Sequence, residues 1–418
     1  MARSKVGLGA GVRFADYLSA GLLARTFPSS LITEVLEKHH CNSERVRSFP
    51  APAVVYYTMA LSLYSESAYE DVFAAVAQGL AWQDKTPMAP VSVVKSGISK
   101  ARSRLTWKAL HDIQRRCCLP LSTPAHGHAF FAGYRLVAMD GSNFDVADEE
   151  KNVAAFGYPG SRTGAVGYPQ AQCAILTECG SHAILDAALG AYRQAEWELA
   201  EPLLRSVTAD MLLMADRGFV GYRHWQAGVK TGAQLLWRMP KNLVLPVEMQ
   251  LDDGSYLSHL YANDRDRKRK ANGLLVRVIE YALPKIPDSE PMYRLLTTLL
   301  DDKIAPALTL AALYHERWEV ELVFDELKTH LVQSRRVLRS KTPELVRQEF
   351  YGWVMAHYAV RRLMYQGAAE ARIPERTLSF SANVQLLRRA QPQSGVIPPC
   401  ASAKMVPRSV RGRRKIVV

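Results

Sequence analysis

Two short apolar runs, each followed by an aspartate, constrain the fold of this chain more than any other feature. "YRLVAM" (134–139) leads into Asp140, and "MLLMA" (211–215) leads into Asp216. Both runs have the length of a buried strand, and open sheets present the residues at strand ends to a crevice where ligands bind. An aspartate at a strand end is also a common turn former. The pair at corresponding ends of neighbouring strands therefore predicts a site better than either residue alone.

The elements around these two strands predict a mixed α/β core. "QAQCAILTECGSHAILDAALG" (170–190) indicates a hairpin that turns at 179–181. Helices are expected at 196–206 and 222–231, and a further strand at 234–239. The predicted order is three strands, helix, strand, helix, strand.

Outside this core, the sequence predicts a helical N-terminal part, a β-rich insertion and a basic C-terminal tail. The N-terminal part lacks strand-like alternation, and the turn signal "DDGSYL" and the run "RDRKRK" predict a β-rich insertion with a basic hairpin. We expect an α/β fold with an all-helical N-terminal domain. The predicted segments are a helical DNA-binding domain (1–125), the first part of the core (126–240), the β-rich insertion (241–296), the second part of the core (297–375) and a basic tail (376–418).

The net charge of +13 favours an extended polyanion such as nucleic acid as partner. Residues 91–110 predict a basic amphipathic helix, which is either a DNA-facing element or an ordinary surface helix. The basic residues expected to bind double-stranded DNA are Lys95, Lys100, Arg102 and Arg104 on this helix, and Arg267, Lys268, Arg269 and Lys270 in the insertion.

Composition excludes several other classes of protein. The six cysteines show no metal-ligand spacing, which argues against zinc and indicates reduced, buried thiols. The longest uncharged apolar run, at 51–64, is too short to span a bilayer. The N-terminus lacks the order of a signal peptide. We therefore expect a cytoplasmic protein without a membrane partner.

"YHERWEVELVFDELK" (314–328) predicts a helix with an unusual polar stripe. At about 100° per residue, Arg317, Glu321 and Lys328 lie roughly 60°, 20° and 40° from Tyr314, all on one side. A solvated face could also produce this arrangement.

Together with Asp140 and Asp216, Glu321 would complete a set of three carboxylates. Such a set can hold two hard divalent cations, Mg²⁺ or Mn²⁺, for hydrolysis of a phosphodiester. Tyr314, Arg317 and Lys328 then make sense as phosphate contacts that flank the metal ligand. Asp325 is the rival third ligand, with a shorter side chain.

These motifs resemble those of the DDE transposases of the insertion-sequence-4 group. The first block of that family matches "AMDGSNFDV", which carries Asp140, and the second matches "LLMADRGFVGY", with Asp216 before Arg217. The third block reads Tyr, two residues, Arg, three residues, Glu, six residues, Lys, and residues 314–328 fit it without a gap. "AFGYPGSR", "VGYPQAQ" and "EWELAEPLL" also resemble segments of the family.

The resemblance implies a ribonuclease-H-like mixed-sheet catalytic core interrupted by a β-rich insertion. It makes Asp140, Asp216 and Glu321 both the catalytic residues and the metal ligands, and it places Arg217 among the DNA-binding residues. The implied activity is binding of terminal inverted repeats, cleavage of the element ends and joining of the 3′-hydroxyl ends to target DNA. A homodimer in a synaptic complex would act, and a hairpin intermediate is suggested.

Two alternatives remain open at this stage. One is a transposase-derived DNA-binding protein that no longer cuts DNA, and the other is a nuclease built on the same core.

Overall fold

The computed structural model describes residues 21–42, 49–83, 94–160, 167–283, 290–332 and 337–389. The chain divides into two compact units, and each is described by itself below. Unit 1 comprises Met1–Leu119, Phe144–Ala171 and Phe324–Pro407, and unit 2 comprises Pro120–Asn143, Gln172–Val323 and Arg408–Val418. The five contiguous segments expected from the sequence stay a prediction.

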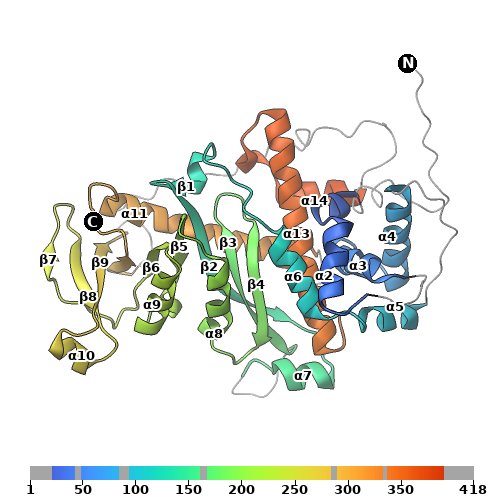
Figure 1. Ribbon diagram of the computed structural model, residues 1–418, viewed down its shortest axis with the longest axis horizontal. Coiled ribbons are helices and arrows are strands. Elements are labelled where there is room, and N and C mark those ends of the chain that lie inside the picture. The colour runs from blue at the N-terminus through green and yellow to red at the C-terminus, as the bar shows by residue number, and fades with distance from the viewer. Residues whose placement is uncertain are drawn as a thin grey trace. The chain divides into compact units, whose positions relative to one another are not determined.

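Unit 1 is built around α13 (Pro343–Ala371), which packs against α3 (Ala51–Leu63) and α6 (Trp107–Cys117) (Figure 1). All residues of α3 from Val54 to Leu63 are buried, which explains why that helix is apolar on every side. Gly352 permits the close approach of α13, because a Cβ there would lie 2.5 Å from the Thr58 carbonyl oxygen. The other helices of unit 1 are α2 (Ser29–Lys38), α4 (Tyr69–Gln83), α5 (Lys95–Arg102), α7 (Glu150–Phe156) and α14 (Phe380–Arg389).

Unit 2 is built on a mixed sheet, as the sequence predicts for the core. The described residues contribute ten strands, in the order β4-β3-β2-β5-β6-β10-β9-β8-β7 with β1 paired to β2 (Figure 1). The strands β2, β5 and β6 run parallel, whereas β6, β10, β9, β8 and β7 pair in antiparallel fashion. The bounds are β1 (Phe130–Phe131), β2 (Tyr134–Asp145), β3 (Gln170–Glu178), β4 (Ile184–Ala191), β5 (Met211–Ala215), β6 (Gln234–Arg238), β7 (Met249–Gln250), β8 (Tyr256–Leu260), β9 (Leu274–Tyr281) and β10 (Tyr293–Thr297).

Helices α8 (Glu196–Ala200) and α9 (Tyr222–Lys230) pack against β4 and β6 of this sheet. The Trp225 ring of α9 meets the Trp237 ring of β6 edge-on, with 5.2 Å between centroids. The expected helix at 196–206 is not uniform, because a 3-10 helix, Glu201–Ser206, follows α8. Pro202 lies in the first turn of that segment, and its ring and missing N–H disfavour continuation of an α-helix.

The basic run of the insertion forms a short helix in the connection between two antiparallel strands. Helix α10 (Asp264–Arg269) connects the antiparallel strands β8 and β9. Asn263 caps its N-terminus by accepting a hydrogen bond from the Asp266 amide at 2.9 Å. The exposed cations of the run project from this connection.

Two helices expected to be continuous are interrupted. The stretch 91–110 contains α5 and the start of α6, separated at 103–106, where Thr106 caps α6; residues 91–93 lie outside the described residues. The acidic stretch contains α11 (Ala307–Tyr314), a 3-10 turn (His315–Trp318), α12 (Glu319–Asp325) and a π-helical turn (Glu326–His330). A constant 100° per residue therefore does not hold along it.

Two expectations from composition can be checked within the described part of the chain. Its five cysteines are buried and none is in a disulfide bond, as expected. No helix there is both long and apolar enough to cross a bilayer.

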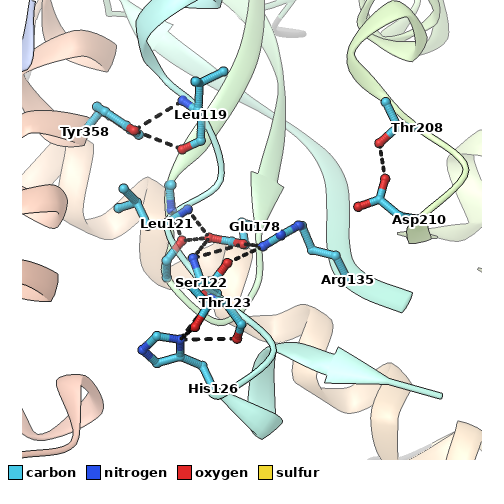
Figure 2. A network of polar contacts seen from close by, with 12 residues as sticks. Leu119, Leu121, Ser122, Thr123, His126, Arg135, Glu178, Thr208, Asp210 and Tyr358 are labelled. Atoms are coloured by element: carbon cyan, nitrogen blue, oxygen red, sulfur yellow. Dashed lines mark hydrogen bonds and ion pairs between the residues drawn. The ribbon is translucent and has the colours of Figure 1, made fainter. Parts of the chain in front are cut away.

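A buried carboxylate, Glu178 at the end of β3, holds the first residues of unit 2 (Figure 2). Glu178 Oε2 accepts hydrogen bonds from the amides of Leu121 at 2.9 Å and Ser122 at 3.0 Å. Arg135 on β2 donates to the same carboxylate and supplies its counter-charge. Because Glu178 is fully buried, these partners offset the cost of removing its charge from water.

We expect Glu178→Gln to lower the free energy of unfolding by about 3 kcal/mol, because Arg135 would lose its counter-charge and an amide group would face the donors. Urea unfolding measures this loss. Asp210→Asn is the matched control, since Asp210 is exposed and accepts from Thr208 Oγ1. The control should change the stability by less than about 0.5 kcal/mol. Equal effects of the two substitutions would contradict the role of Glu178.

Candidate active site

The parallel pairing of β2 with β5 brings the two motif aspartates to the same level of the sheet. In the register of this pair, Met139 is opposite Ala215. Asp140 and Asp216 are the next residues on their strands, so both lie where the pairing ends. The strand β2 itself continues to Asp145, whereas the sequence predicts that it ends at Asp140.

The helical segment that carries Glu321 is attached to both of these strand ends. At the end of α11, the hydroxyl of Tyr314 donates to the Ala215 carbonyl oxygen at 3.3 Å. One turn later, Arg317 Nη1 donates to Asp140 Oδ2 at 2.9 Å, and its guanidinium carbon lies 5.6 Å from the centre of the Tyr314 ring. Tyr314 and Arg317 thus fix the segment against β5 and β2, respectively.

The carboxylates of this site are electrostatically coupled. Burial raises the pKa of Asp140 and the negative charge of Asp216 raises it further, although Arg317 and the Gly141 amide oppose the shift. Burial, followed by the charges of Asp140 and Asp216, likewise raises the pKa of Glu321. The pKa of a fourth carboxyl group, Glu196 on α8, is raised by burial and by the same two aspartates. A proton or a nearby cation would relieve this repulsion.

Arg317 supplies the positive charge at this site. Burial alone would lower its pKa, but the Tyr314 hydroxyl and the carboxylates of Asp140 and Asp216 outweigh burial and raise it. The guanidinium group is therefore a fixed cation that is paired with Asp140.

A second group of charges lies next to Asp216. Arg238 Nη1 is 4.0 Å from Asp216 Oδ1, and Arg238 Nη2 is 2.8 Å from Glu290 Oε1. Glu290 also pairs with Arg217 at 3.4 Å and with Lys241 at 3.5 Å. Burial would raise the pKa of Glu290, but the hydrogen bond and charge of Arg238, together with Lys241, lower it.

The donor atoms at the site suit a hard divalent cation. They are carboxylate oxygens, which Mg²⁺ and Mn²⁺ prefer. Asp216 Oδ1 is buried and accepts no hydrogen bond, so one donor atom has a lone pair available. As they stand, no three His, Cys, Asp or Glu side chains within the described residues are gathered closely enough to hold a metal ion. Because Arg317 already neutralises Asp140, we expect a bound cation to compete with Arg317 for that carboxylate.

The structure places the predicted DNA-binding residues in different surroundings. Tyr314 is buried and its hydroxyl is bonded to the backbone, so it does not present a phosphate contact. Arg102 is also buried, and its guanidinium donates to Ser340 Oγ at 3.2 Å and to the Leu345 carbonyl at 2.9 Å. Lys328 belongs to unit 1, where its Nζ lies 5.0 Å from the centre of the Phe144 ring. The exposed cations are Lys95, Lys100, Arg104, Arg217, Arg267, Lys268, Arg269 and Lys270.

Three charged residues of this region escaped the sequence analysis. Glu196 begins the segment "EWELAEPLL", which was matched to the family without a role for any one residue. Arg238 and Glu290 belong to no motif. Arg238 ends β6, and Glu290 precedes β10. Both come close to Asp216 only because β6 pairs with β5 and β10 pairs with β6, which no short-range sequence pattern indicates.

Comparison with known proteins assigns a class to this fold and site. Residues 131–359, just over half of the chain, match the family model described as Transposase DDE domain. Residues 18–114 match the model described as Insertion element 4 transposase N-terminal. The chain therefore belongs to the DDE transposases, and within them it is a transposase of the insertion element 4 family.

Individual relatives agree with this assignment. The chain is 29% identical over 300 residues to the transposase InsG for insertion sequence element IS4 of Escherichia coli, covering 71% of this chain and 67% of that protein. It is 26% identical over 155 residues to the putative transposase y4zB of Sinorhizobium fredii, covering 35% of this chain and 40% of that protein.

Among solved structures, a piggyBac transposase synaptic complex with hairpin DNA aligns with 9% identity and a TM-score of 0.46, over 89% of this chain and 79% of that one.

We expect Arg317→Gln to lower the free energy of unfolding by about 2–3 kcal/mol at pH 8, because the buried Asp140 carboxylate loses its counter-charge. Asp140 already has a raised pKa, and loss of Arg317 raises it further. The penalty exists only while Asp140 is ionised, so it should shrink as the pH falls toward the value of an unfolded aspartate, about 3.9. Urea unfolding in chelator at pH 8 and pH 5 measures both effects.

Added Mn²⁺ should restore more stability to Arg317→Gln than to the wild-type protein, since the cation replaces the lost charge. Arg267→Gln, which changes an exposed arginine, is the control. If the loss of unfolding free energy in Arg317→Gln is the same at both pH values and does not change with Mn²⁺, Arg317 acts only in packing.

Proposed function

We propose that this transposase binds the terminal inverted repeats of its element, hydrolyses a phosphodiester at each end and joins the freed 3′-hydroxyl groups to target DNA. The observation that carries the proposal is the parallel register of β2 and β5. In this register Asp140 lies beside Asp216. The charges of both aspartates act on the pKa values of Arg317 and Glu321. Family membership supports the reaction type, and the order of the two Asp blocks and the Glu helix supports the roles of the residues.

The core is proposed to be ribonuclease-H-like. The strand order β4-β3-β2-β5-β6 supports this, with β2, β5 and β6 parallel and the two aspartates directly after the last paired residues of β2 and β5. The strands β7 to β10 extend the sheet beyond β6, in the region expected to be the β-rich insertion.

Asp140, Asp216 and Glu321 are proposed to hold two Mg²⁺ or Mn²⁺ ions. When bound, such ions act as Lewis acids that activate the attacking oxygen and stabilise the leaving oxygen of a phosphodiester. Arg317, once it separates from Asp140, is suited to a bidentate contact with a phosphate near the scissile bond. Lys328 is assigned a point-charge contact with the same backbone, as the family motif implies. Tyr314 instead acts as a positioning residue, because its hydroxyl is bonded to Ala215.

The exposed cations are proposed to contact DNA away from the scissile phosphate. Lys95, Lys100 and Arg104 present positive charge on unit 1, and Arg267, Lys268, Arg269 and Lys270 do so on unit 2. Arg217 lies directly after Asp216 and would meet the backbone near the site. Because two ends must be joined in one reaction, the acting species is proposed to be a homodimer in a synaptic complex.

We expect Asp140→Asn, Asp216→Asn and Glu321→Gln each to reduce cleavage of end DNA by at least about 1,000-fold. A neutral amide binds a divalent cation poorly, and the loss of one ligand removes several kcal/mol of transition-state stabilisation. Binding of end DNA should persist, because the exposed cations are unchanged. Single-turnover cleavage and gel-shift assays on the same preparations measure the two properties.

Asp325→Asn is the matched control for this series, because Asp325 is exposed and pairs with His330 at 3.1 Å. It should retain cleavage close to that of wild type. If Asp325→Asn lost cleavage and Glu321→Gln kept it, the assignment of the third ligand would be wrong. A wild-type chain that binds end DNA but never nicks it in Mg²⁺ would instead favour the catalytically inactive DNA-binding protein.

Cleavage should proceed in Mg²⁺ or Mn²⁺ and fail in Ca²⁺, because Ca²⁺ also binds carboxylates but adopts a larger and less regular coordination sphere. Excess chelator should abolish cleavage, and returning Mg²⁺ should restore it. The measurement is the initial rate of nicking of end DNA in each ion. Full activity in excess chelator would exclude the role proposed for the three carboxylates.

A further inference from the structure

Glu196 is a carboxylate at the active site to which neither the sequence motifs nor the proposed function gives a role. It is the first residue of α8 and thus comes from a different element than Asp140, Asp216 or Glu321. Its carboxylate lies against the two glycines that follow the motif aspartates. An ideal Cβ on Gly141 would lie 2.9 Å from Glu196 Cδ, and one on Gly218 would lie 3.5 Å from Glu196 Oε2.

The direction of Glu196 is set by the packing of its helix. Leu199 and Ala200 of α8 are buried. The neighbouring Trp197 ring stacks on His224 with 4.1 Å between centroids, and it lies 6.2 Å from the ring of Trp237. Glu198, two residues further along, is exposed to solvent. The helix therefore holds Glu196 beside the strand ends, where a fourth negative charge is unfavourable unless a cation binds there.

We infer that Glu196 is a fourth carboxylate ligand of the catalytic centre and shares a divalent cation with Asp140 and Asp216. This inference rests on the proposed function, because it concerns the same metal site. A pair of divalent cations has more coordination positions than three carboxylates fill, so a fourth carboxylate can take a position otherwise left to a water or phosphate oxygen. The inference also explains Gly141, because any side chain at that position would displace the Glu196 carboxylate.

The direct test is Mn²⁺ binding by the full-length chain without DNA, followed by the electron paramagnetic resonance signal of free Mn²⁺. We expect Glu196→Gln to weaken Mn²⁺ binding by about tenfold or more. Glu198→Gln, on the same helix, should bind Mn²⁺ as the wild type does. Wild-type Mn²⁺ affinity in Glu196→Gln would overturn the inference.

A second pair of variants tests the position of the carboxylate while keeping its charge. Gly141→Ala should also weaken Mn²⁺ binding, because the new Cβ pushes Glu196 aside. Gly218→Ala should have little effect, since its Cβ would make only an ordinary contact at 3.5 Å. This pair remains informative if Glu196→Gln fails to fold, and equal Mn²⁺ affinities for Gly141→Ala and the wild type would count against the inference.

Asp216→Asn separates failure of this inference from failure of the proposed function. If Asp216→Asn loses Mn²⁺ binding and Glu196→Gln keeps it, the three-carboxylate site stands and the role of Glu196 is refuted. If Asp216→Asn binds Mn²⁺ as tightly as wild type, the proposed metal site itself is wrong.

Discussion

The ion pair between Arg317 and Asp140 is the contact on which the arrangement of the candidate active site depends. Asp140 lies on β2 where its pairing with β5 ends, and Glu321 lies on a helical segment far along the chain. A contact between the two elements is therefore needed to bring them together. Arg317 provides it through a 2.9 Å hydrogen bond, and Tyr314 adds a second attachment at the Ala215 carbonyl. Both residues lie within two turns of Glu321, so they also fix the position of the helical segment that carries Glu321.

The same contact stabilises a cluster of charge that would otherwise oppose folding. Asp140, Glu196 and Glu321 all have raised pKa values, because each is desolvated and lies near other carboxylates. Arg317 offsets this repulsion, and the aromatic packing of Trp225, Trp237 and Trp197 supports the sheet beneath it. Sites that bind metal commonly hold like charges together in this way at a cost in stability. A cation that displaces Arg317 from Asp140 would also free the guanidinium for DNA, which links metal binding to phosphate binding.

Much of this site could be predicted from the sequence, because its strongest signals are local. The apolar runs that precede Asp140 and Asp216 pair in parallel, which explains why the two aspartates are neighbours. Helical spacing predicts Tyr314 and Arg317 on one side of the segment. Periodicity does not show which atoms the Tyr314 hydroxyl contacts on that side. The sequence therefore predicts a phosphate contact for Tyr314, whereas its hydroxyl donates to the Ala215 carbonyl oxygen. Arg102 resembled a surface cation because its acceptors, Ser340 and Leu345, lie more than 230 residues away. Glu196 could not be found because only the folded chain brings α8 to Gly141.

We expect Asp140 to exchange Arg317 for a divalent cation when the enzyme engages DNA. A crystal structure of the full chain with end DNA and Mn²⁺, with anomalous scattering used to locate manganese, tests it most directly. We expect manganese bound to Asp140 and Asp216, with the Arg317 guanidinium turned away from Asp140 and onto a phosphate. Manganese bound elsewhere, with Arg317 still hydrogen-bonded to Asp140, would contradict it.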